Sequence, residues 1–207
     1  MRSVMTKIRN RPADAVGEAK QLIDDIVEKL MCDDNVTLHL MNGKNEFEDI
    51  YFHSLNVAVI AMMIGRAKGY PAEQLKALSF AALFHDMGKI KIPTAILRKQ
   101  VPLSEPESNY LKLHTKYGLD MANQIEGFPE SAKTVIVQHH ELRDGSGYPE
   151  GLKGDEIDKL AQVIIVANAF DNLCHTPVPA EQKSHIRHFP TYIRTANTYI
   201  KKRTLIS

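Results

Sequence analysis

Two pairs of neighbouring side chains in this sequence have the chemistry of metal ligands. His85 is followed directly by Asp86, and His139 is followed directly by His140. Neighbouring side chains on a helix point about 100° apart, so the members of a pair cannot easily bind one small ion from the same side. They can bind two ions, or the carboxylate can bridge the ions while the imidazole binds one of them. The two pairs therefore predict at least two metal ions.

Three further side chains extend this candidate set. His53 and His114 lie in segments with helical periodicity, and Asp49 lies one helical turn before His53 on the same face. A single histidine on a helix is usually an ordinary core or surface residue, and Asp49 can equally be an exposed helix carboxylate. The prediction therefore depends on the whole set. Imidazole and carboxylate groups without thiolates suit Fe, Mn, Ni or Zn better than Ca or Mg. Such ions hold phosphate oxygens and activate water, which predicts phosphoester hydrolysis.

Two features beside the histidine pairs could contact a phosphate-containing ligand. Lys89 follows Gly88 in the sequence HDMGK, where a lysine can reach a phosphate as a point charge. It can also be an ordinary lysine that complements the dipole at the end of a helix. The second feature is the glycine-rich stretch DGSGYP at 144–149, which directly follows HHELR and predicts a tight turn beside the second pair.

The segments that must position these side chains read as helices. Apolar residues recur every three or four positions over 14–31, 46–69, 71–88, 104–125 and 129–140, and a loop covers 141–153. The segment 157–173 contains a β-branched run that favours a strand locally. Its length and its apolar spacing favour a buried helix, which is our prediction. The sequence thus predicts an all-α bundle.

The bulk composition excludes several classes of protein. The chain has 207 residues, of which 43% are hydrophobic and 25% charged, as in ordinary globular proteins. Its longest apolar run, 55–65, is too short to cross a bilayer, and the N-terminus has no secretory signal pattern. A net charge of +1 gives no case for binding a nucleic-acid polymer. Two distant cysteines indicate a reducing compartment, so we expect a cytoplasmic protein.

Three motifs together resemble a known family. HDMGKIKIP, HHELRDGSGYPEGLKGDEI and ANAFDNL occur in this order, with His53 upstream and His114 between the first two. They resemble the HD-GYP phosphodiesterases of bacterial cyclic-dinucleotide signalling over roughly residues 46–175. The resemblance implies an all-helical HD-domain bundle with an HD-GYP loop and two or three metals, most often iron. It also implies hydrolysis of cyclic di-GMP, or of a related cyclic dinucleotide, to linear pGpG or GMP.

The resemblance also implies roles for individual residues. Lys89 and Asp86 take catalytic positions. Tyr148 lines the ligand pocket or a docking surface for a signalling-domain partner, while Gly145 and Gly147 give the turn its backbone freedom. The implied metal ligands are His53, His85, Asp86, His114, His139, His140, Asn168 and Asp49. The implied substrate-binding residues are Asp144, Gly145, Gly147, Tyr148 and Pro149.

Departures from the family pattern support an alternative function. Asn168 stands where most members have an aspartate ligand, and an amide oxygen is a weaker ligand than a carboxylate. CHTPVPAEQKSHIRHF stands where members usually have the basic RPYR segment. The alternative is a catalytically weakened domain that senses a cyclic dinucleotide or binds a partner. We expect an N-terminal helical extension over 1–45, the HD-GYP domain over 46–181 and a divergent or truncated basic segment over 182–207.

Overall fold

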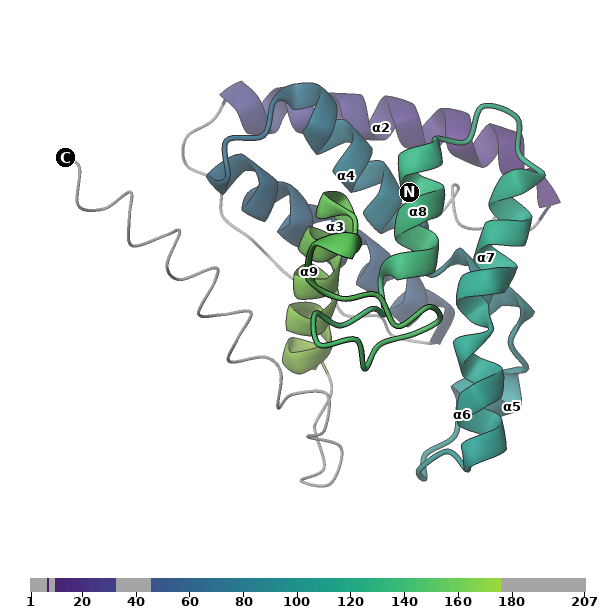
Figure 1. Ribbon diagram of the computed structural model, residues 1–207. Helices are drawn as coiled ribbons and strands as arrows, with labels where there is room; N and C mark the ends of the chain where they lie inside the picture. The colour runs from purple at the N-terminus through teal and green to yellow at the C-terminus, as the bar shows by residue number, and fades with distance from the viewer. Residues whose placement is uncertain (1–6, 8–9, 33–45, 176–207) are drawn as a thin grey trace.

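The protein is seen here as a computed structural model that describes residues 7, 10–32 and 46–175 (Figure 1). Its regular elements over these residues are helices, as predicted, apart from one isolated β-bridge between Asp144 and Lys153. None of the described helices combines the length and the apolar character needed to cross a bilayer. In chain order the elements are α2 (Pro12–Cys32), α3 (Glu46–Ala67), α4 (Ala72–Phe84), η1 (Met87–Lys91), α5 (Thr94–Leu97), α6 (Glu105–Lys112), α7 (His114–Asn123), α8 (Glu130–Gln138), η2 (Gly154–Glu156) and α9 (Lys159–His175).

Helix α4 is the centre of the bundle. It packs against α2, α3, α8 and α9, and residues 79–84 are all buried. A helix that is apolar on every side belongs in a core rather than on a surface. Phe80 and Phe84 of α4 also pack against Phe128, with ring centroids 5.2 and 5.6 Å from that of Phe128. The C-terminal end of α4 therefore delivers the residues that follow it, His85 and Asp86, into the interior of the bundle.

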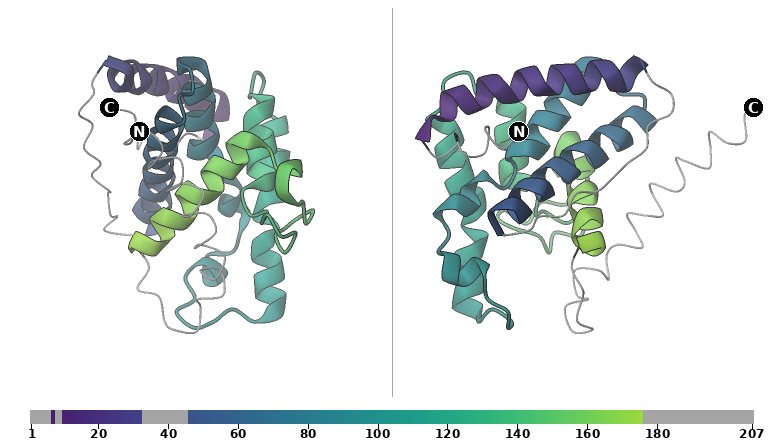
Figure 2. Two further views of the ribbon diagram at one scale, coloured as in Figure 1. Left: turned by 60° about the vertical axis from the view of Figure 1, so that its left-hand side comes forward. Right: turned by 180° about the vertical axis from the view of Figure 1, so that it is seen from behind.

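Helix α2 lies across one end of the bundle and packs against α4 (Figure 2). Its buried side chains join the same core as those of α3, α4, α8 and α9. They recur at three- and four-residue intervals, as the sequence predicted for this segment: Ala15, Val16, Ala19, Ile23, Val27 and Leu30.

Two of the predicted helices differ from the structure. The segment 71–88 is not one helix, because α4 ends at Phe84 and a 3₁₀ turn, η1, carries Lys89. The segment 104–125 divides at Leu113 into α6 and α7. The side chain of Thr115 donates a hydrogen bond to the carbonyl of Lys112 at 3.1 Å across this break. The break has a packing cause, since α7 packs on η1 and α8 whereas α6 has no buried residue.

The ambiguous segment 157–173 is helical, as predicted. It forms α9, which packs against α3 and α8, and Val163, Ile164 and Ile165 are all buried. Tertiary burial therefore decides against the local strand preference of this β-branched run.

Candidate metal centre

The carboxylate of Asp86 lies at the centre of a buried group of histidines. Its Oδ2 atom is 3.3 Å from Nε2 of His85 and 3.6 Å from Nε2 of His53. Its Oδ1 atom is 3.3 Å from Nε2 of His114 and 3.5 Å from Nε2 of His139. Asp86, His85, His114 and His139 are each no more than 3% exposed. Side chains from α3, from α7 and from the residues that directly follow α4 and α8 therefore meet at one carboxylate, although they span almost ninety positions of the sequence.

The protonation state of three of these rings follows from their hydrogen bonds. The Nδ1 atom of each lies close to the backbone carbonyl three residues earlier, at 2.6 Å for His85, 2.7 Å for His114 and 2.9 Å for His139. A carbonyl oxygen can only accept a hydrogen bond, so Nδ1 carries the proton. In a neutral ring, Nε2 is then an unprotonated nitrogen whose lone pair points toward Asp86.

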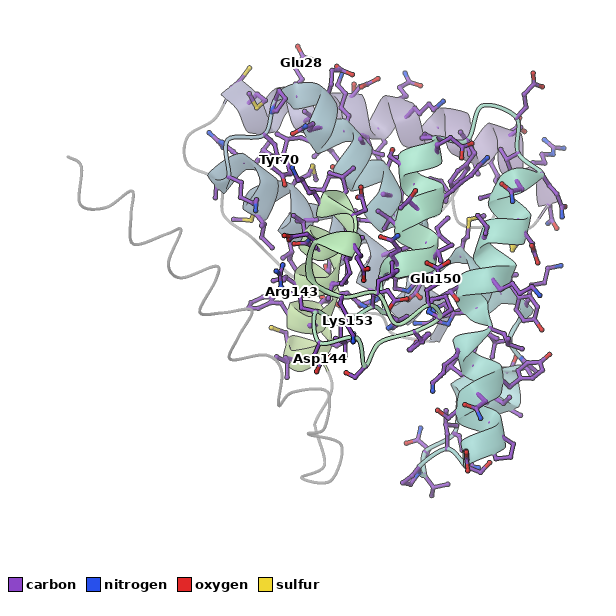
Figure 3. All side chains as sticks on the ribbon, viewed as in Figure 1. Glu28, Tyr70, Arg143, Asp144, Glu150 and Lys153 are labelled. Atoms are coloured by element: carbon purple, nitrogen blue, oxygen red, sulfur yellow. The ribbon has the colours of Figure 1, made fainter. Side chains whose placement is uncertain are left out.

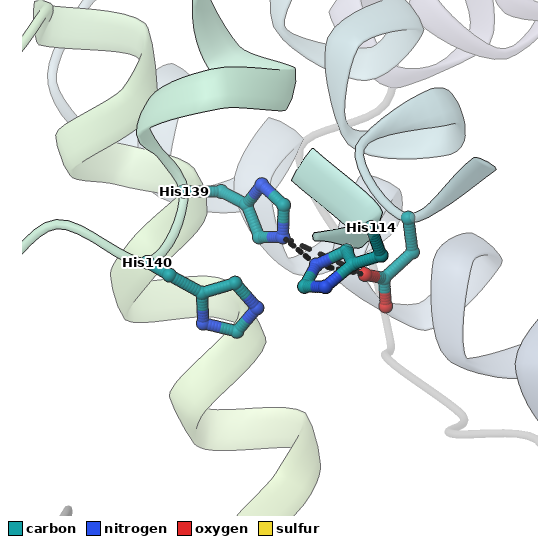
Figure 4. A group of neighbouring side chains, drawn as sticks. His114, His139 and His140 are labelled. Carbon is teal, nitrogen blue, oxygen red and sulfur yellow. Dashed lines mark hydrogen bonds and ion pairs between the residues drawn. The ribbon is translucent and has the colours of Figure 1, made fainter. Parts of the chain in front are cut away.

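These lone pairs converge in a way that a bound cation would stabilise. The Nε2 atoms of His114 and His139 are 3.2 Å apart, next to the negative carboxylate (Figure 4). Two acceptor nitrogens cannot form a hydrogen bond with each other, and facing lone pairs repel. Nε2 of His85 and Oδ1 of Asp86 are also buried without a hydrogen bond to any residue of the described part of the chain. Such unpaired acceptors are costly unless an ion binds them. The cluster is thus compatible with a divalent metal site.

The candidate ligands form two groups that share Asp86. One consists of His53, His85 and Asp86, and the other contains Asp86 together with His114, His139 and His140. Within each group the ligand atoms lie within 4.8 Å of one another. A carboxylate common to both groups is one of the two arrangements that the sequence analysis left open for the HD and HH pairs.

The electrostatics of the cluster favour the metal-binding forms of the side chains. Burial alone would raise the pKa of Asp86, but the positive charge of Lys89 is the first of the opposing causes that hold the pKa well below its usual range. The Nζ atom of Lys89 is 2.5 Å from Oδ2. Burial lowers the pKa of His139 to about 4 and also lowers the pKa of His140 and of His53. These three rings are therefore neutral near pH 7, as metal ligands must be.

Asp171 orients His53, a role that the sequence analysis missed. Its buried Oδ2 atom accepts a hydrogen bond from Nδ1 of His53 at 2.7 Å, which leaves Nε2 facing Asp86. A carboxylate behind a ligating histidine fixes its tautomer and orientation. The available signal was its spacing, because Asp171 follows Asn168 by three residues on the same helix.

Asn168 is also buried in α9, and its Oδ1 atom accepts a hydrogen bond from the side chain of Asn172 at 3.0 Å. Its ligand role stays a prediction. Asp49 falls in the first turn of α3, but its side chain lies outside the described part of the structure. The tail 182–207 also lies outside it.

Gly88 brings the backbones that carry Asp86 and His114 together. A Cβ atom at position 88 would lie 1.9 Å from the carbonyl oxygen of His114 and 2.5 Å from the backbone nitrogen of Gly118. No side-chain rotation can relieve contacts with backbone atoms. Sequence reasoning treated Gly88 only as the end of a helix, whereas the structure uses it for the close approach of η1 to α7.

Glu141 holds the loop that follows the second histidine pair. Its side chain is fully buried and accepts hydrogen bonds from three successive backbone N–H groups, those of Glu150 at 2.7 Å, Gly151 at 3.2 Å and Leu152 at 3.0 Å. A buried carboxylate is stable only when such donors satisfy it. Because Glu141 directly follows His140, these hydrogen bonds hold the loop segment 150–152 next to the second histidine pair. Sequence reasoning gave Glu141 no role.

Tyr148 is the predicted substrate-binding residue that reaches the histidines. Its ring stacks on His140, with centroids 4.6 Å apart and an interplanar angle of 15°. Gly147 permits this position because a Cβ there would lie 2.3 Å from the backbone nitrogen of Leu142. Gly145 has a positive φ of 82°, the backbone freedom predicted for it, while the requirement at Gly147 is close approach.

Two other loop residues predicted to bind substrate are exposed. Asp144 is exposed, and its carboxylate accepts hydrogen bonds from the backbone and hydroxyl of Ser146 at 2.9 and 2.6 Å. Pro149 is also exposed and follows Tyr148 through a cis peptide bond. Arg143, Asp144 and Lys153 project from the part of the loop next to α9 (Figure 3).

Comparison with known proteins identifies the family of this fold. The family model described as HD domain matches residues 21–202, and the chain therefore belongs to the HD domain family. A cyclic di-GMP phosphodiesterase of Pseudomonas aeruginosa is 30% identical over 169 residues, which is 82% of this chain and 41% of that protein. The cyclic di-GMP phosphodiesterase response regulator RpfG of Xanthomonas campestris is 36% identical over 55% of this chain and 30% of its own length.

A third relative, the 3′3′-cGAMP-specific phosphodiesterase 1 of Vibrio cholerae, is 33% identical over 79% of this chain and 36% of its own length. Among solved structures, Bd1817, an HDG"Y"P protein of Bdellovibrio bacteriovorus, has a TM-score of 0.77 at 22% identity and covers 97% of this chain and 69% of its own. It shares the fold. These matches confirm the predicted HD-GYP membership. The chain spans less than half the length of these three curated relatives.

Proposed function

We propose that this domain hydrolyses cyclic di-GMP, or a related cyclic dinucleotide, to linear pGpG or GMP. In this proposal it uses two divalent transition metals, or three if Asp49 takes part, and iron is favoured over Mn, Ni or Zn. The observation that carries the proposal is the convergence of histidine Nε2 atoms on the buried carboxylate of Asp86. The relatives named as phosphodiesterases for cyclic di-GMP and cGAMP support the substrate class.

Each part of the cluster has a task in this reaction. Bound divalent metals would stabilise the charge of a phosphate and make water a better nucleophile near neutral pH. The ligands proposed to hold them are His53, His85, His114, His139, His140 and Asn168, with Asp86 shared between the two groups. Asp171 keeps Nε2 of His53 directed toward Asp86. The buried surroundings exclude bulk water, which strengthens every charge interaction at the centre.

Lys89 is the proposed catalytic cation. Its side chain is 25% exposed while its Nζ atom is held beside Asp86, so the ammonium lies between the buried carboxylate and solvent. In the proposed hydrolysis, water attacks the phosphorus and the bond from phosphorus to the 3′-oxygen breaks. The leaving oxygen needs a proton, and the Lys89 ammonium can donate it.

Tyr148 and the loop from Asp144 to Pro149 form the proposed wall of the substrate site. Burial raises the pKa of Tyr148, so its hydroxyl stays protonated and can donate a hydrogen bond to a ligand. Gly145 and Gly147 shape the backbone of this wall.

A catalytically weakened domain that senses a cyclic dinucleotide or binds a signalling partner through the loop is the alternative. Asn168 favours this alternative. Its side-chain oxygen already accepts a hydrogen bond from Asn172, and an amide binds a metal more weakly than a carboxylate. The exposed loop residues Asp144 and Pro149 would be available to a partner. In either case we propose a cytoplasmic location, which the two free cysteines support.

The deciding experiment measures metal content and turnover on the same anaerobic preparation. Cyclic di-GMP and cGAMP are incubated with the protein, and the products are separated by chromatography. Product formation that falls at least a hundredfold in Lys89→Met, but not in the exposed control Lys91→Met, supports hydrolysis. Bound metal and bound dinucleotide without product support the alternative, and Asn168→Asp should then restore activity. Protein that holds neither metal nor dinucleotide rejects both hydrolysis and dinucleotide sensing, and leaves only the binding of a signalling partner.

A further inference from the structure

Lys112 places a positive charge at the rim of the metal centre. It is the last residue of α6 and precedes His114 by two positions. Its Nζ atom lies over the ring of Tyr148, 5.5 Å from the ring centroid, and the same ring stacks on His140. The loop residue Tyr148 therefore contacts both a candidate metal ligand and this ammonium. Figure 1 shows how the loop between α8 and α9 extends toward the α6–α7 pair.

The ammonium of Lys112 is available to a ligand. Within the described residues it has no ion pair with a carboxylate, whereas Lys89, Lys99 and Lys133 each have one. The side chain is exposed, and the attraction of an exposed lysine to a tyrosine ring is weak. An incoming anion would therefore gain the charge without breaking a stronger interaction in the protein.

The position of Lys112 fits a substrate with a second phosphate. Lys89 is held at the Asp86 centre, where the proposed reaction takes place, and Lys112 lies beyond Tyr148. A cyclic dinucleotide carries two phosphodiester groups on opposite sides of one macrocycle. If one of them is at the Asp86 centre, the other faces away from it and meets the rim.

We propose that Lys112 binds the second, uncleaved phosphate of a cyclic dinucleotide and so distinguishes this substrate from simple phosphodiesters. The inference rests on the proposed function and deepens it. In this arrangement the Tyr148 ring positions the lysine side chain until the substrate arrives. The charge-assisted contact of Lys112 with the phosphate replaces the weak contact with the ring. Lys112 thus contributes to substrate affinity, while the reacting groups remain those of the Asp86 centre.

The test compares two substrates in matched variants. Lys112→Met removes the charge and keeps a flexible side chain, and Lys112→Arg restores the charge. Lys116→Met removes an exposed lysine four residues further along the chain, in α7, as the control. The substrates are cyclic di-GMP, with two phosphodiesters, and bis(p-nitrophenyl) phosphate, with one. Loss of one charge-assisted hydrogen bond corresponds to about a tenfold change in affinity.

We expect Lys112→Met to raise the KM for cyclic di-GMP about tenfold with little change in kcat and no effect on bis(p-nitrophenyl) phosphate. Lys112→Arg should recover most of the affinity, and Lys116→Met should behave as wild type. An equal loss with both substrates, or no loss with either, would overturn the proposal.

Binding separates this inference from the proposed function. If wild type hydrolyses neither substrate, the proposed hydrolysis fails, and calorimetric titration of cyclic di-GMP into metal-loaded protein decides the role of Lys112. A tenfold weaker Kd in Lys112→Met alone supports the phosphate contact. Equal Kd values in all variants, or no binding by wild type, reject it.

Discussion

Replacement of Glu141 by glutamine should destabilise the protein and loosen the loop that carries Tyr148. The substitution preserves the size of the side chain but removes its charge and one of its acceptor atoms. In the structure Oε1 accepts hydrogen bonds from the N–H groups of Glu150 and Gly151, and Oε2 accepts one from Leu152. Whichever way the amide turns, its NH₂ group meets a backbone N–H donor, and at least one donor loses its partner.

The expected cost follows from these contacts. A hydrogen bond to a charged group contributes about 1.5–3 kcal/mol and one between neutral groups about 1 kcal/mol. Glu141→Gln loses one hydrogen bond to a charged group and weakens the remaining contacts. The neutral amide, however, costs less to bury than the carboxylate. We therefore expect the free energy of unfolding to fall by about 3 kcal/mol. For a domain of this size that corresponds to a decrease in Tm of about 6–12 °C.

Two measurements on Glu141→Gln check this reasoning. Thermal denaturation should give the lower Tm, while Glu150→Gln, which changes an exposed loop carboxylate, should remain within about 2 °C of wild type. Hydrogen exchange of the amides of Glu150, Gly151 and Leu152 should become at least tenfold faster. An unchanged Tm together with unchanged exchange at these three amides would refute the role given to Glu141.

Two further predictions concern the histidines. Asp171→Asn should lower the affinity for a divalent metal about 10- to 100-fold in competition titrations, because His53 loses its orienting carboxylate; equal affinity in this variant and in the exposed control Asp155→Asn would contradict it. In metal-free protein, stability should fall as the pH drops from 6.5 toward 4, because burial lowers the pKa of His139 from its ordinary 6.5 to about 4 in the folded protein. The unfolded chain takes up that proton first, so His139 alone accounts for a loss of about 3 kcal/mol. Urea denaturation across this range measures the loss, and a flat profile would contradict the burial of a neutral His139.

Most of the helical architecture could be predicted from periodicity, and its failures have packing causes. The β-branched run in α9 was correctly predicted as a helix because its apolar residues recur at helical spacing over a long segment. The breaks after Phe84 and at Leu113 carry no proline or strong local signal. They arise because η1 must meet α7 at Gly88, a contact between segments that are distant in sequence.

In the candidate site, too, local sequence features could be predicted and contacts between distant segments could not. The metal-ligand chemistry could be predicted because histidine and aspartate are the residues that bind such ions and the HD and HH pairs are adjacent in the chain. Glu141 and Asp171 were missed because each acts on a residue that only folding brings close. The proposed role of Lys112 was missed for the same reason, since it depends on the contact with Tyr148. Glu141 accepts from backbone groups about ten residues away, and Asp171 lies 118 residues from His53. No periodicity or adjacency in the sequence indicates such contacts.

The central claim is that the histidine nitrogens around Asp86 bind two metal ions. A crystal structure of anaerobically prepared protein, with diffraction data on both sides of the absorption edge of the bound metal, tests it most directly. We expect two anomalous peaks with the Asp86 carboxylate between them, one beside His53 and His85 and the other beside His114, His139 and His140. Stoichiometric metal with its peaks elsewhere, or the absence of any peak at Asp86 after metal loading, would contradict the claim.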